Sequence, residues 1–435
     1  MSMKKYLKHF SFLLVIGLVL AACSVDDSES NASGDGKVEI EFWYGLGSEA
    51  DEKMKELISD FNEEHEDIEV TAVPQADYDE TYEKLQAAIA SDTAPGVFLS
   101  EITPLTDLAS KDALEPIDDF VANDDIYDED DFLDVLLDPG YIDDSLYALP
   151  GYGTTQVMYY RKDIFDEVGV DPEEAYETWE NLADASKELQ DSGEVDYGHL
   201  PMWDEDNLID LALSNGGSIL NEDETELMID EPEWIDAWEF IREQVHEEKT
   251  MKINSGGQGW EYWYKTIDQV MNGSAAGYTG SSGDKGDLDF DKIDSLPQPG
   301  LNGNEGKPRV NGLYLSIPKG ISDEEKEAAY EWMSYFTSSE VNADWSKAIG
   351  YVPVRESTTE EEDYADFVEE NPYANVPYEQ ALDATPEFVD PTGGKIMDAL
   401  SIAADKVEIE NVPAEKALEE AQEAGQKALD EYNND

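Results

Sequence analysis

Residues 38–45 read VEIEFWYG, and in this run apolar residues alternate with polar ones before a glycine ends it. Such alternation predicts a β-strand over 38–44. The following stretch predicts a helix, because Ser48 and Asp51 resemble a capping box and apolar residues then recur at helical spacing. These apolar residues are Met54, Leu57, Ile58 and Phe61. We therefore expect strand, loop and helix in succession.

Strand and helix patterns alternate further along the chain. We expect a second strand over 70–73, a helix over 78–90 and a third strand over 97–99. Repeated βα units predict an α/β fold with a mostly parallel sheet covered on both faces. Ligands of such sheets bind beyond the carboxyl ends of the strands. The residues at two of these ends, which we expect near a ligand site, are Trp43, Tyr44, Ser100 and Glu101.

The N-terminus has the pattern of a bacterial lipoprotein signal peptide. Three lysines among the first eight residues precede an apolar run over 10–20, and two small residues then precede the single cysteine, Cys23. We expect cleavage of residues 1–22, lipidation of Cys23 and a flexible tether over 23–36 that holds the protein at the outer face of the cell membrane. The alternative is a chance apolar start followed by an unmodified cysteine.

Length and charge restrict the class of protein. The 435 residues are 40% hydrophobic and 10% aromatic, which excludes a disordered chain and favours two domains with cores of their own. The formal charge is −77, and without the three signal lysines 24 basic face 104 acidic residues, which gives −80. Concentrated salt screens such repulsion, so the composition suggests an organism that lives in high salt. We expect no nucleic-acid partner, because the chain offers no basic stripe.

Known motifs for catalysis and metal binding do not occur in the sequence. Outside the signal peptide, His65, His199 and His246 lie far apart without the spacing of a zinc site. We find no nucleophile elbow, phosphate loop or dinucleotide fingerprint. Acidic residues are so abundant that no carboxylate pair stands out as that of a glycosidase. We expect no cofactor, no metal and no enzymatic activity, with a glycoside-acting enzyme and an adhesive or structural lipoprotein as alternatives.

Several motifs resemble those of a transporter family. They occur at 163–165 (DIF), 169–172 (GVDP), 178–182 (TWENL), 215–218 (NGGS), 312–318 (GLYLSIP) and 349–353 (IGYVP). From Lys37 onward the chain resembles the extracellular solute-binding proteins of sugar-type ABC importers, the group that includes maltose-binding protein. The resemblance implies a two-lobed, periplasmic-binding-protein-like α/β fold of type II, with a ligand enclosed between the lobes.

The same resemblance implies a hinge that the chain crosses three times. Segments that combine a strand-like run with proline or glycine suit such crossings. The expected crossings are 149–151, 295–299 and 349–353. The first lobe then comprises 37–149 and 298–348, and the second comprises 150–297 and 349–435.

Within that family the motifs are most similar to those of the glycerol-3-phosphate-binding members. The similarity implies ligand contacts from Tyr78, Glu101, Thr154, Thr155, Ser281, Ser282, Gly312 and Tyr351. Those relatives also place an arginine on the phosphate, but residues 390–395 contain none. Lys395 is a possible substitute, although an ammonium does not reproduce a bidentate guanidinium. We therefore expect a neutral sugar or short oligosaccharide, with glycerol 3-phosphate or a glycerophosphodiester as the alternative.

Sugar capture needs aromatic rings for the apolar face of the sugar and polar groups for its hydroxyls. The tyrosines at a predicted strand end, helix start or hinge suit this role, and they are Tyr44, Tyr78 and Tyr351. Trp203 lies in a polar loop, where an exposed ring suggests a ligand or the other lobe as its partner. We assign Trp179, Trp332 and Trp345 to the core, because they stand at helical spacing beside apolar residues.

The sequence thus predicts a monomeric, lipid-anchored substrate-binding component of an ABC importer. Its partners would be a small carbohydrate or glycerophosphate, the membrane and the permease subunits. Contacts made from both lobes exist only when the lobes close, so binding shifts the protein to the closed form, which the permease recognises.

Overall fold

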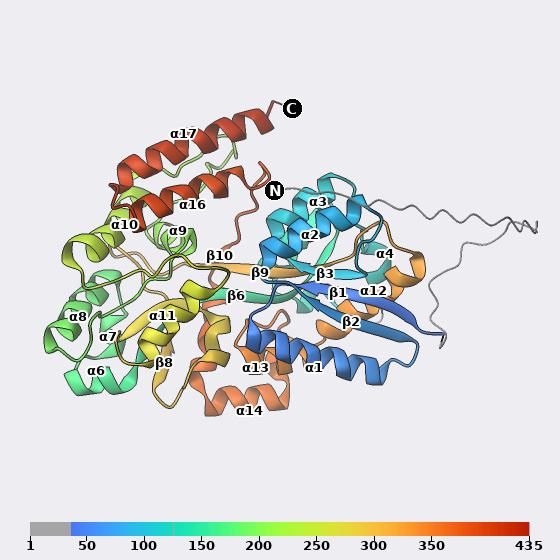
Figure 1. The fold of residues 1–435 in the computed structure, drawn as a ribbon, viewed down its shortest axis with the longest axis horizontal. Coiled ribbons are helices and arrows are strands. Elements are labelled where there is room, and N and C mark those ends of the chain that lie inside the picture. Colours follow the sequence, from blue (N-terminus) through green and yellow to red (C-terminus); the bar gives the residue numbers. More distant parts are fainter. Residues whose placement is uncertain (1–35, 125, 435) are drawn as a thin grey trace, which may run out of the picture.

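The computed structural model of this chain describes residues 36–124 and 126–434, which fold into two α/β lobes that lie side by side (Figure 1). The predicted signal peptide over 1–22, the lipidation of Cys23 and the predicted tether up to residue 35 lie outside the described residues. Within the described residues, no helix is both long enough and apolar enough to cross a membrane.

The main sheet runs through both lobes in the strand order β2-β1-β3-β9-β6-β7, with β10 beside β9 and β8 beside β6. The predicted strand over 38–44 is confirmed as β1 (Val38–Tyr44), which pairs in parallel with β2 (Ile68–Pro74) and β3 (Val97–Ser100). The expectation of a mostly parallel sheet is wrong beyond these strands. β9 (Arg309–Ser316) runs antiparallel to both β3 and β6 (Ala148–Arg161), because the chain returns here from the other lobe.

β6 connects the two lobes. Its residues up to Thr155 pair with β9 in the first lobe, and its residues from Gln156 onward pair with two strands of the second. The space between the lobes therefore lies against the middle of β6 and the start of β9. The other strands are β4 (Tyr141–Ile142), β5 (Ser145–Leu146), β7 (Gly277–Ser281), β8 (Ile293–Leu296) and β10 (Thr385–Pro386).

Helices of the first lobe cover its part of the sheet. In α1 (Ser48–Glu64) the predicted apolar stripe is buried, as helical spacing requires. The predicted capping box is wrong, because Gly47 is the N-cap and the Asp51 carboxylate instead accepts a hydrogen bond from the Tyr44 hydroxyl. The other helices of this lobe are α2 (Tyr78–Ala90), α3 (Ile102–Ser110), α4 (Asp118–Val121), η1 (Glu129–Asp131), α5 (Asp134–Leu137), η2 (Asp138–Gly140), α12 (Asp323–Phe336) and α13 (Ser339–Ile349).

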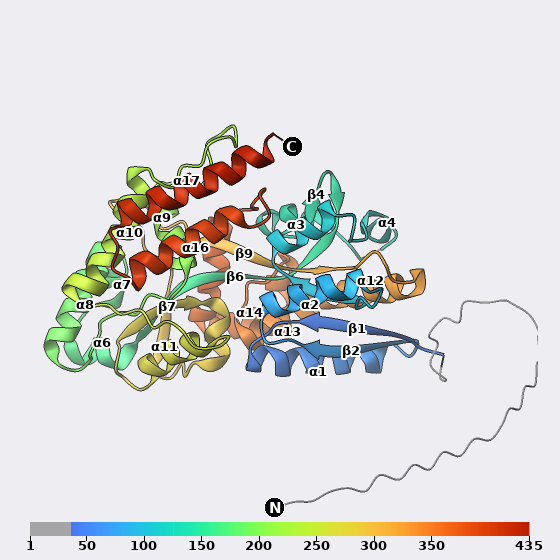
Figure 2. The ribbon, with the colours of Figure 1, turned by 45° about the horizontal axis from the view of Figure 1, so that its top comes forward.

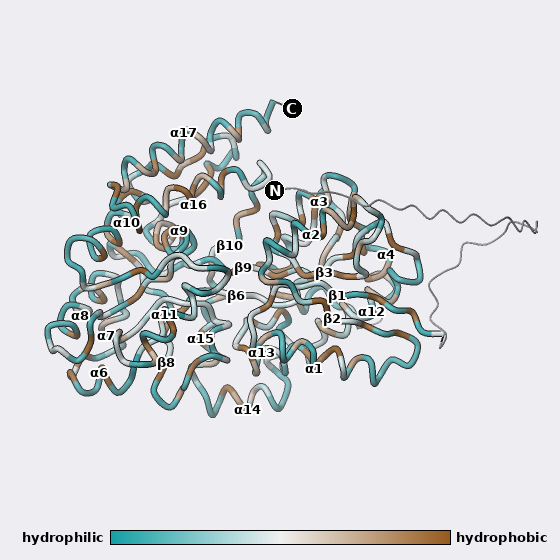
Figure 3. The backbone as a smooth tube through the Cα atoms, viewed as in Figure 1, coloured by the Kyte–Doolittle hydropathy of each residue, from teal (hydrophilic) through white to brown (hydrophobic). Residues whose placement is uncertain are grey.

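The second lobe is mostly helical, and α16 (Lys395–Glu408) and α17 (Ala414–Tyr432) lie side by side on it in both views (Figures 1 and 2). Hydrophilic and hydrophobic residues alternate along these helices (Figure 3), as expected for helices with one face on the core. The other helices of this lobe are α6 (Lys162–Val168), α7 (Pro172–Ala175), α8 (Trp179–Ser192), α9 (Glu205–Ser214), α10 (Pro232–Arg242), η3 (Glu243–Glu248), α11 (Glu261–Met271) and η4 (Ser282–Asp287).

A third group of short helices follows α13 and lies below the middle of the molecule in Figure 1. Its members are η5 (Ser357–Glu360), α14 (Glu362–Glu370), η6 (Pro372–Asn375) and α15 (Val376–Leu382). The assignment of Trp179, Trp332 and Trp345 to the core is confirmed, since all three side chains are fully buried.

The membership of residues in the two hydrophobic cores indicates where the chain crosses from one lobe to the other. Leu301 belongs to the hydrophobic cluster of the second lobe, whereas Val352 and Val354 belong to that of the first. These contacts favour crossings at about Gln156, near Arg309 and beyond Val354, each some residues later than the sequence suggested. The division of the chain into lobes remains our proposal, with these later positions preferred.

Candidate functional site

A cavity of about 230 Å³ lies between the lobes, where α1, α2, β6, β9, α9, α11 and η4 approach one another. Seven of the residues predicted to bind ligand line it. They are Tyr78, Glu101, Thr154, Thr155, Trp203, Ser281 and Tyr351. Segments far apart in the sequence thus bring these side chains to one cavity, and their part in binding remains a prediction.

Four predicted residues lie outside the lining. Tyr44 is fully buried in the core of the first lobe, because it shares the inward face of β1. Ser282 is buried behind Ser281, and the N–H of Gly312 donates to the Glu387 carboxylate at 2.9 Å. Lys395 is exposed at the first turn of α16. For these four the expected position at the ligand site is therefore corrected.

Three tyrosines form a connected group on the first-lobe side, which we call the tyrosine cluster (Tyr78, Tyr152 and Tyr351). The hydroxyls of Tyr78 and Tyr152 are hydrogen-bonded at 2.9 Å, and the rings of Tyr152 and Tyr351 stack with centroids 4.2 Å apart. Asp77 caps α2 by accepting from the Glu80 N–H, which fixes the start of the helix and so the position of Tyr78. Burial raises the pKa of all three phenols, so they are neutral.

Three tryptophans line the opposite side, which we call the tryptophan wall (Trp203, Trp260 and Trp263). The Trp203 indole N–H donates to Asp405 of α16 at 2.9 Å, and the Trp263 N–H donates to Asp284 at 2.6 Å. The Trp260 ring lies 6.4 Å from the Tyr78 ring, edge to face, so it reaches the other lobe. Because the N–H groups of Trp203 and Trp263 are taken up by carboxylates, their ring surfaces are what they can offer a ligand.

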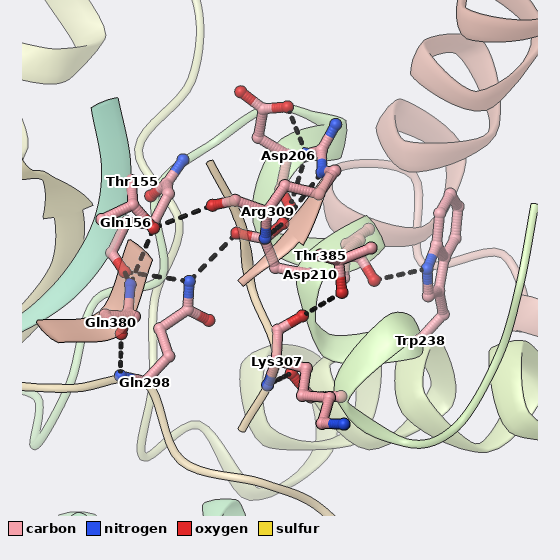
Figure 4. Close-up of polar contacts among 12 residues, drawn as sticks. Thr155, Gln156, Asp206, Asp210, Trp238, Gln298, Lys307, Arg309, Gln380 and Thr385 are labelled. Carbon is pink, nitrogen blue, oxygen red and sulfur yellow. Dashed lines mark hydrogen bonds and ion pairs between the residues drawn. The ribbon is translucent and has the colours of Figure 1, made fainter. Parts of the chain in front are cut away.

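Arg309 lies at the bottom of the cavity between two aspartates of α9 (Figure 4). Its Nη2 donates to Asp206 at 2.6 Å and its Nε to Asp210 at 2.9 Å. Gln298 completes the group by donating to the second Asp210 oxygen at 3.0 Å. Burial alone would lower the pKa of the Arg309 guanidinium, but the two carboxylates raise it, so the side chain is charged and paired.

Seven carboxylate side chains line the cavity within the described part of the chain: Glu49, Glu101, Asp204, Asp206, Asp210, Asp284 and Asp287. Among the lining residues described, Arg309 is the one cation. Burial raises the pKa of Glu101 to about 7, and the carboxylates of Asp206, Asp79 and Asp204 add to this. Burial also raises the pKa of Asp284 to about 8, against the hydrogen bonds from Trp263 and Tyr278.

Carboxylates of the two lobes face each other across the cavity. Burial raises the pKa of Asp287 in η4, and Glu49 of α1 adds to it. Burial likewise raises the pKa of Asp79 in α2, with Asp77 and then Asp204 of the second lobe adding to it. Asp204 itself has φ +117°, a strained conformation for a residue other than glycine, and strain of this kind is frequent at functional sites.

Acceptors on the two hinge strands are unsatisfied. The side-chain oxygens of Gln156 on β6 and Asn311 on β9 are buried and have no hydrogen-bond partner among the described residues. Both residues line the cavity. Buried carbonyl oxygens are rarely left without a donor, so a ligand hydroxyl or N–H is a natural partner for them.

Reasoning from the sequence alone missed the charged group at the bottom of the cavity. Asp206 follows Trp203 by three residues, in the first turn of α9, so its place in the sequence is a weak signal for a site residue. No local pattern marks Arg309, which reaches Asp210 across 99 residues of sequence. Within the described residues we find no group of histidine, cysteine and carboxylate side chains that could hold a metal ion.

Comparison with known proteins gives a consistent set of relatives. Residues 56–372 match the sequence profile of the family described as bacterial extracellular solute-binding protein. The sn-glycerol-3-phosphate-binding periplasmic protein UgpB of Pectobacterium atrosepticum is 25% identical over 397 residues, which are 84% of this chain and 84% of that protein. UgpB of Escherichia coli is 25% identical over 412 residues, 88% of this chain and 87% of that protein.

Solved structures share the fold. The GacH receptor of Streptomyces glaucescens, determined unliganded and in complex with acarbose, matches with a TM-score of 0.81 and 20% identity over 91% of this chain and 99% of that one. UgpB from Mycobacterium tuberculosis, in complex with glycerophosphocholine, matches with a TM-score of 0.78 and 22% identity over the same shares. The predicted two-lobed fold of type II is therefore confirmed.

Proposed function

This chain belongs to the family of bacterial extracellular solute-binding proteins, and we propose that it captures a carbohydrate between its lobes for an ABC importer. The observation that carries the proposal is the cavity between the lobes, with aromatic rings on both sides. A sugar ring can lie against such rings while its hydroxyls meet Thr154, Ser281 and the free acceptors of the hinge strands. The family consists of solute-binding proteins, which argues against an enzyme.

Closure of the lobes is the proposed mechanism of capture. The tyrosine cluster belongs to the first lobe and hinge, and the tryptophan wall belongs to the second, so a ligand between them contacts both. Contacts that exist only in the closed form shift the equilibrium toward it. In our proposal the membrane permease then recognises the closed shape.

A glycerophosphate is the second candidate ligand. The names of the UgpB relatives favour it, and so does Arg309, whose Nη1 makes no hydrogen bond within the described residues. Against it stand the two aspartates on the same guanidinium, because a phosphate at Nη1 would lie beside their negative charges. Lys395, the other cation considered, lies outside the lining. We therefore prefer the carbohydrate.

Cellular placement follows from the family and from the N-terminal sequence. The family is extracellular, and we propose that lipidation of Cys23 holds this member, a monomer, at the outer face of the membrane. We also propose that the charge of −77 reflects life in high salt. Dialysis of the protein to low salt should then cause unfolding or loss of binding, and full stability there would contradict this part of the proposal.

A thermal-shift screen tests the function. The mature chain, in concentrated salt, is screened against mono- and oligosaccharides, polyols, glycerol 3-phosphate and glycerophosphodiesters. A ligand that binds only the folded form raises the melting temperature as its concentration rises. We expect a carbohydrate to do so. A shift with glycerophosphates alone would establish the second candidate, and no shift with any compound would contradict solute capture by this cavity.

A further inference from the structure

We infer that the cavity selects a carbohydrate with a positively charged amine, that is, an amino sugar. The inference rests on the proposed function and departs from the neutral sugar that the sequence suggested. Among the described residues, seven carboxyl side chains and a single arginine line the cavity. Arg309 is paired with Asp206 and Asp210 (Figure 4). The pKa of Asp284, raised to about 8, leaves that carboxyl mostly protonated near neutral pH. The carboxylates that no cation among the described lining residues balances are therefore Glu49, Glu101, Asp204 and Asp287.

Glu101 is the best placed of these carboxylates to meet an ammonium group. It caps α3 without a side-chain hydrogen bond, and it makes no hydrogen bond or ion pair within the described residues. Its side chain is accessible from the cavity, although protein surrounds it. The negative charges of Asp79, Asp204 and Asp206 make a further negative charge at Glu101 unfavourable. The same charges favour a positive group of the ligand at this position. A carboxylate in this setting attracts a cation.

The remaining needs of an ammonium group are also present in the cavity. An ammonium has three N–H donors and no acceptor, so it needs several oxygen acceptors around it. The buried side-chain oxygens of Gln156 and Asn311 are acceptors without a donor among the described residues. The tryptophan wall adds ring faces, which attract cations that lie within about 6 Å of the ring centre. Carboxylate, carbonyl oxygens and indole faces together form a binding environment for a cation.

Salt adaptation alone does not explain these carboxylates. Acids that adapt a surface to salt lie in water, where hydration and ions stabilise their charge. Asp287 is instead half-buried, and burial raises the pKa of its carboxyl, so its charge is destabilised by the position. Asp287 also faces Glu49 of the other lobe. A cation on the ligand would relieve this repulsion when the lobes close.

Pairs of sugars that differ only in the charged group test the inference. We would measure by calorimetry, at several pH values from about 6 to about 8, the affinities of 2-amino sugars and their oligomers, because both the sugar amine and Glu101 change charge in this range. Each is compared with the N-acetylated and the 2-hydroxy counterpart of the same length and linkage. We expect the tightest ligand to carry the free amine and to bind at least about tenfold more tightly than either counterpart.

Other outcomes separate this inference from the proposed function. If a 2-hydroxy or N-acetylated sugar binds as tightly as its amine, the inference is overturned while carbohydrate capture stands. If no member of any pair binds, carbohydrate capture fails and the inference fails with it.

A substitution of Glu101 tests whether this residue causes the preference for the amine. Glu101→Gln keeps the size of the side chain and removes its charge, so the ratio of the affinity for the amine to the affinity for its hydroxy counterpart should fall about tenfold, whatever the change in either affinity alone. Glu419→Gln removes the same charge from an exposed position on α17 and serves as the matched control. An equal effect of the two substitutions would show that the net charge of the protein, and not the cavity, attracts the amine.

Discussion

The tyrosine cluster holds its rings through one another, whereas the tryptophan wall holds its rings through carboxylates from elsewhere in the fold. Tyr78, Tyr152 and Tyr351 are joined by a hydroxyl hydrogen bond and a stacked pair. Trp203 instead depends on Asp405, 202 residues away in sequence, and Trp263 on Asp284. The tyrosine cluster is therefore neutral and fixed by packing among its own rings, and the tryptophan wall is fixed by polar contacts to other elements.

This difference suggests separate tasks for the two sides. A neutral, interlocked group of rings offers a constant shape, so we assign shape selection to the tyrosine cluster. The tryptophan wall offers ring faces beside Asp204 and Asp206, so we assign to it, together with Glu101 of the first lobe, the selection of a charged ligand. If the assignment is right, substitutions in the tyrosine cluster and substitutions in the tryptophan wall should differ in how much they change the free energy of unfolding relative to the affinity for ligand.

The largest effect is expected from Arg309, which joins α9 to the hinge strand β9. Arg309→Met leaves Asp210 buried without its cation and removes the partner of the partly exposed Asp206. Removal of one partner from a buried pair typically costs about 3–5 kcal/mol. Urea unfolding would measure the loss. Lys427→Met removes the same charge from an exposed pair with Glu431, where about 0–1 kcal/mol is expected. Equal effects of the two substitutions would mean that this polar network does not hold the second side.

The second effect concerns binding and compares the two sides directly. Trp203→Ala and Tyr78→Ala each remove a ring from the lining, and we expect each to weaken carbohydrate binding more than tenfold with little change in the free energy of unfolding. Calorimetry on the tightest ligand of the screen, with urea unfolding in parallel, measures both quantities.

The matched controls are Trp203→Phe and Tyr78→Phe, which keep a ring and remove its polar group. Tyr78→Phe should bind almost normally if the tyrosine cluster supplies shape. Trp203→Phe should lose part of the affinity, because its contact with Asp405 is gone. Unchanged affinity in both alanine variants would show that the ligand lies elsewhere.

Local sequence patterns predicted the first side better than the second. The strand over 38–44 and the helix that starts at Tyr78 follow from short-range signals, and the two-lobed fold follows from the resemblance to a family. Even the misplaced Tyr44 had a usable signal, because it shares the alternation of Ile40 and Phe42 and therefore faces the core. Tyr44 lies at the end of a strand, and ligands often bind near strand ends, which is why it was expected in the cavity. The alternation of buried and exposed residues along β1 is the better guide, and it places Tyr44 in the core.

The second side depends on contacts that no local pattern reveals. Arg309 meets Asp210 only after α9 and β9 are brought together, and the same is true of Trp203 and Asp405. Loop residues of this kind can be suspected of a function from their chemistry, as Trp203 was. Their partners are set by tertiary packing, so the charge of the cavity could not be deduced before the fold was known.

The smallest expected effect is a dependence of lobe closure on pH. It arises from the repulsion between Glu101 of the first lobe and the aspartates of the second lobe. Glu101, whose pKa is raised to about 7, faces Asp79 of α2, Asp204 and Asp206 at the start of α9, and, near the hinge, Glu387. Opening of the lobes would remove the second-lobe aspartates and hydrate Glu101, which returns its pKa toward the ordinary value of about 4.3. Between these two values the closed form binds more protons than the open form.

The sign of the effect follows from that difference. As pH falls from about 8 to about 6, Glu101 takes up a proton only in the closed form, so the closed population of the ligand-free protein should rise. Because the side chain is accessible from the cavity, we expect no more than about a fivefold change. X-ray scattering at low and high salt measures closure, and screening should reduce the effect. Glu101→Gln should abolish most of it, and an unaltered pH response in that variant would mean that other carboxylates, such as Glu387, control closure.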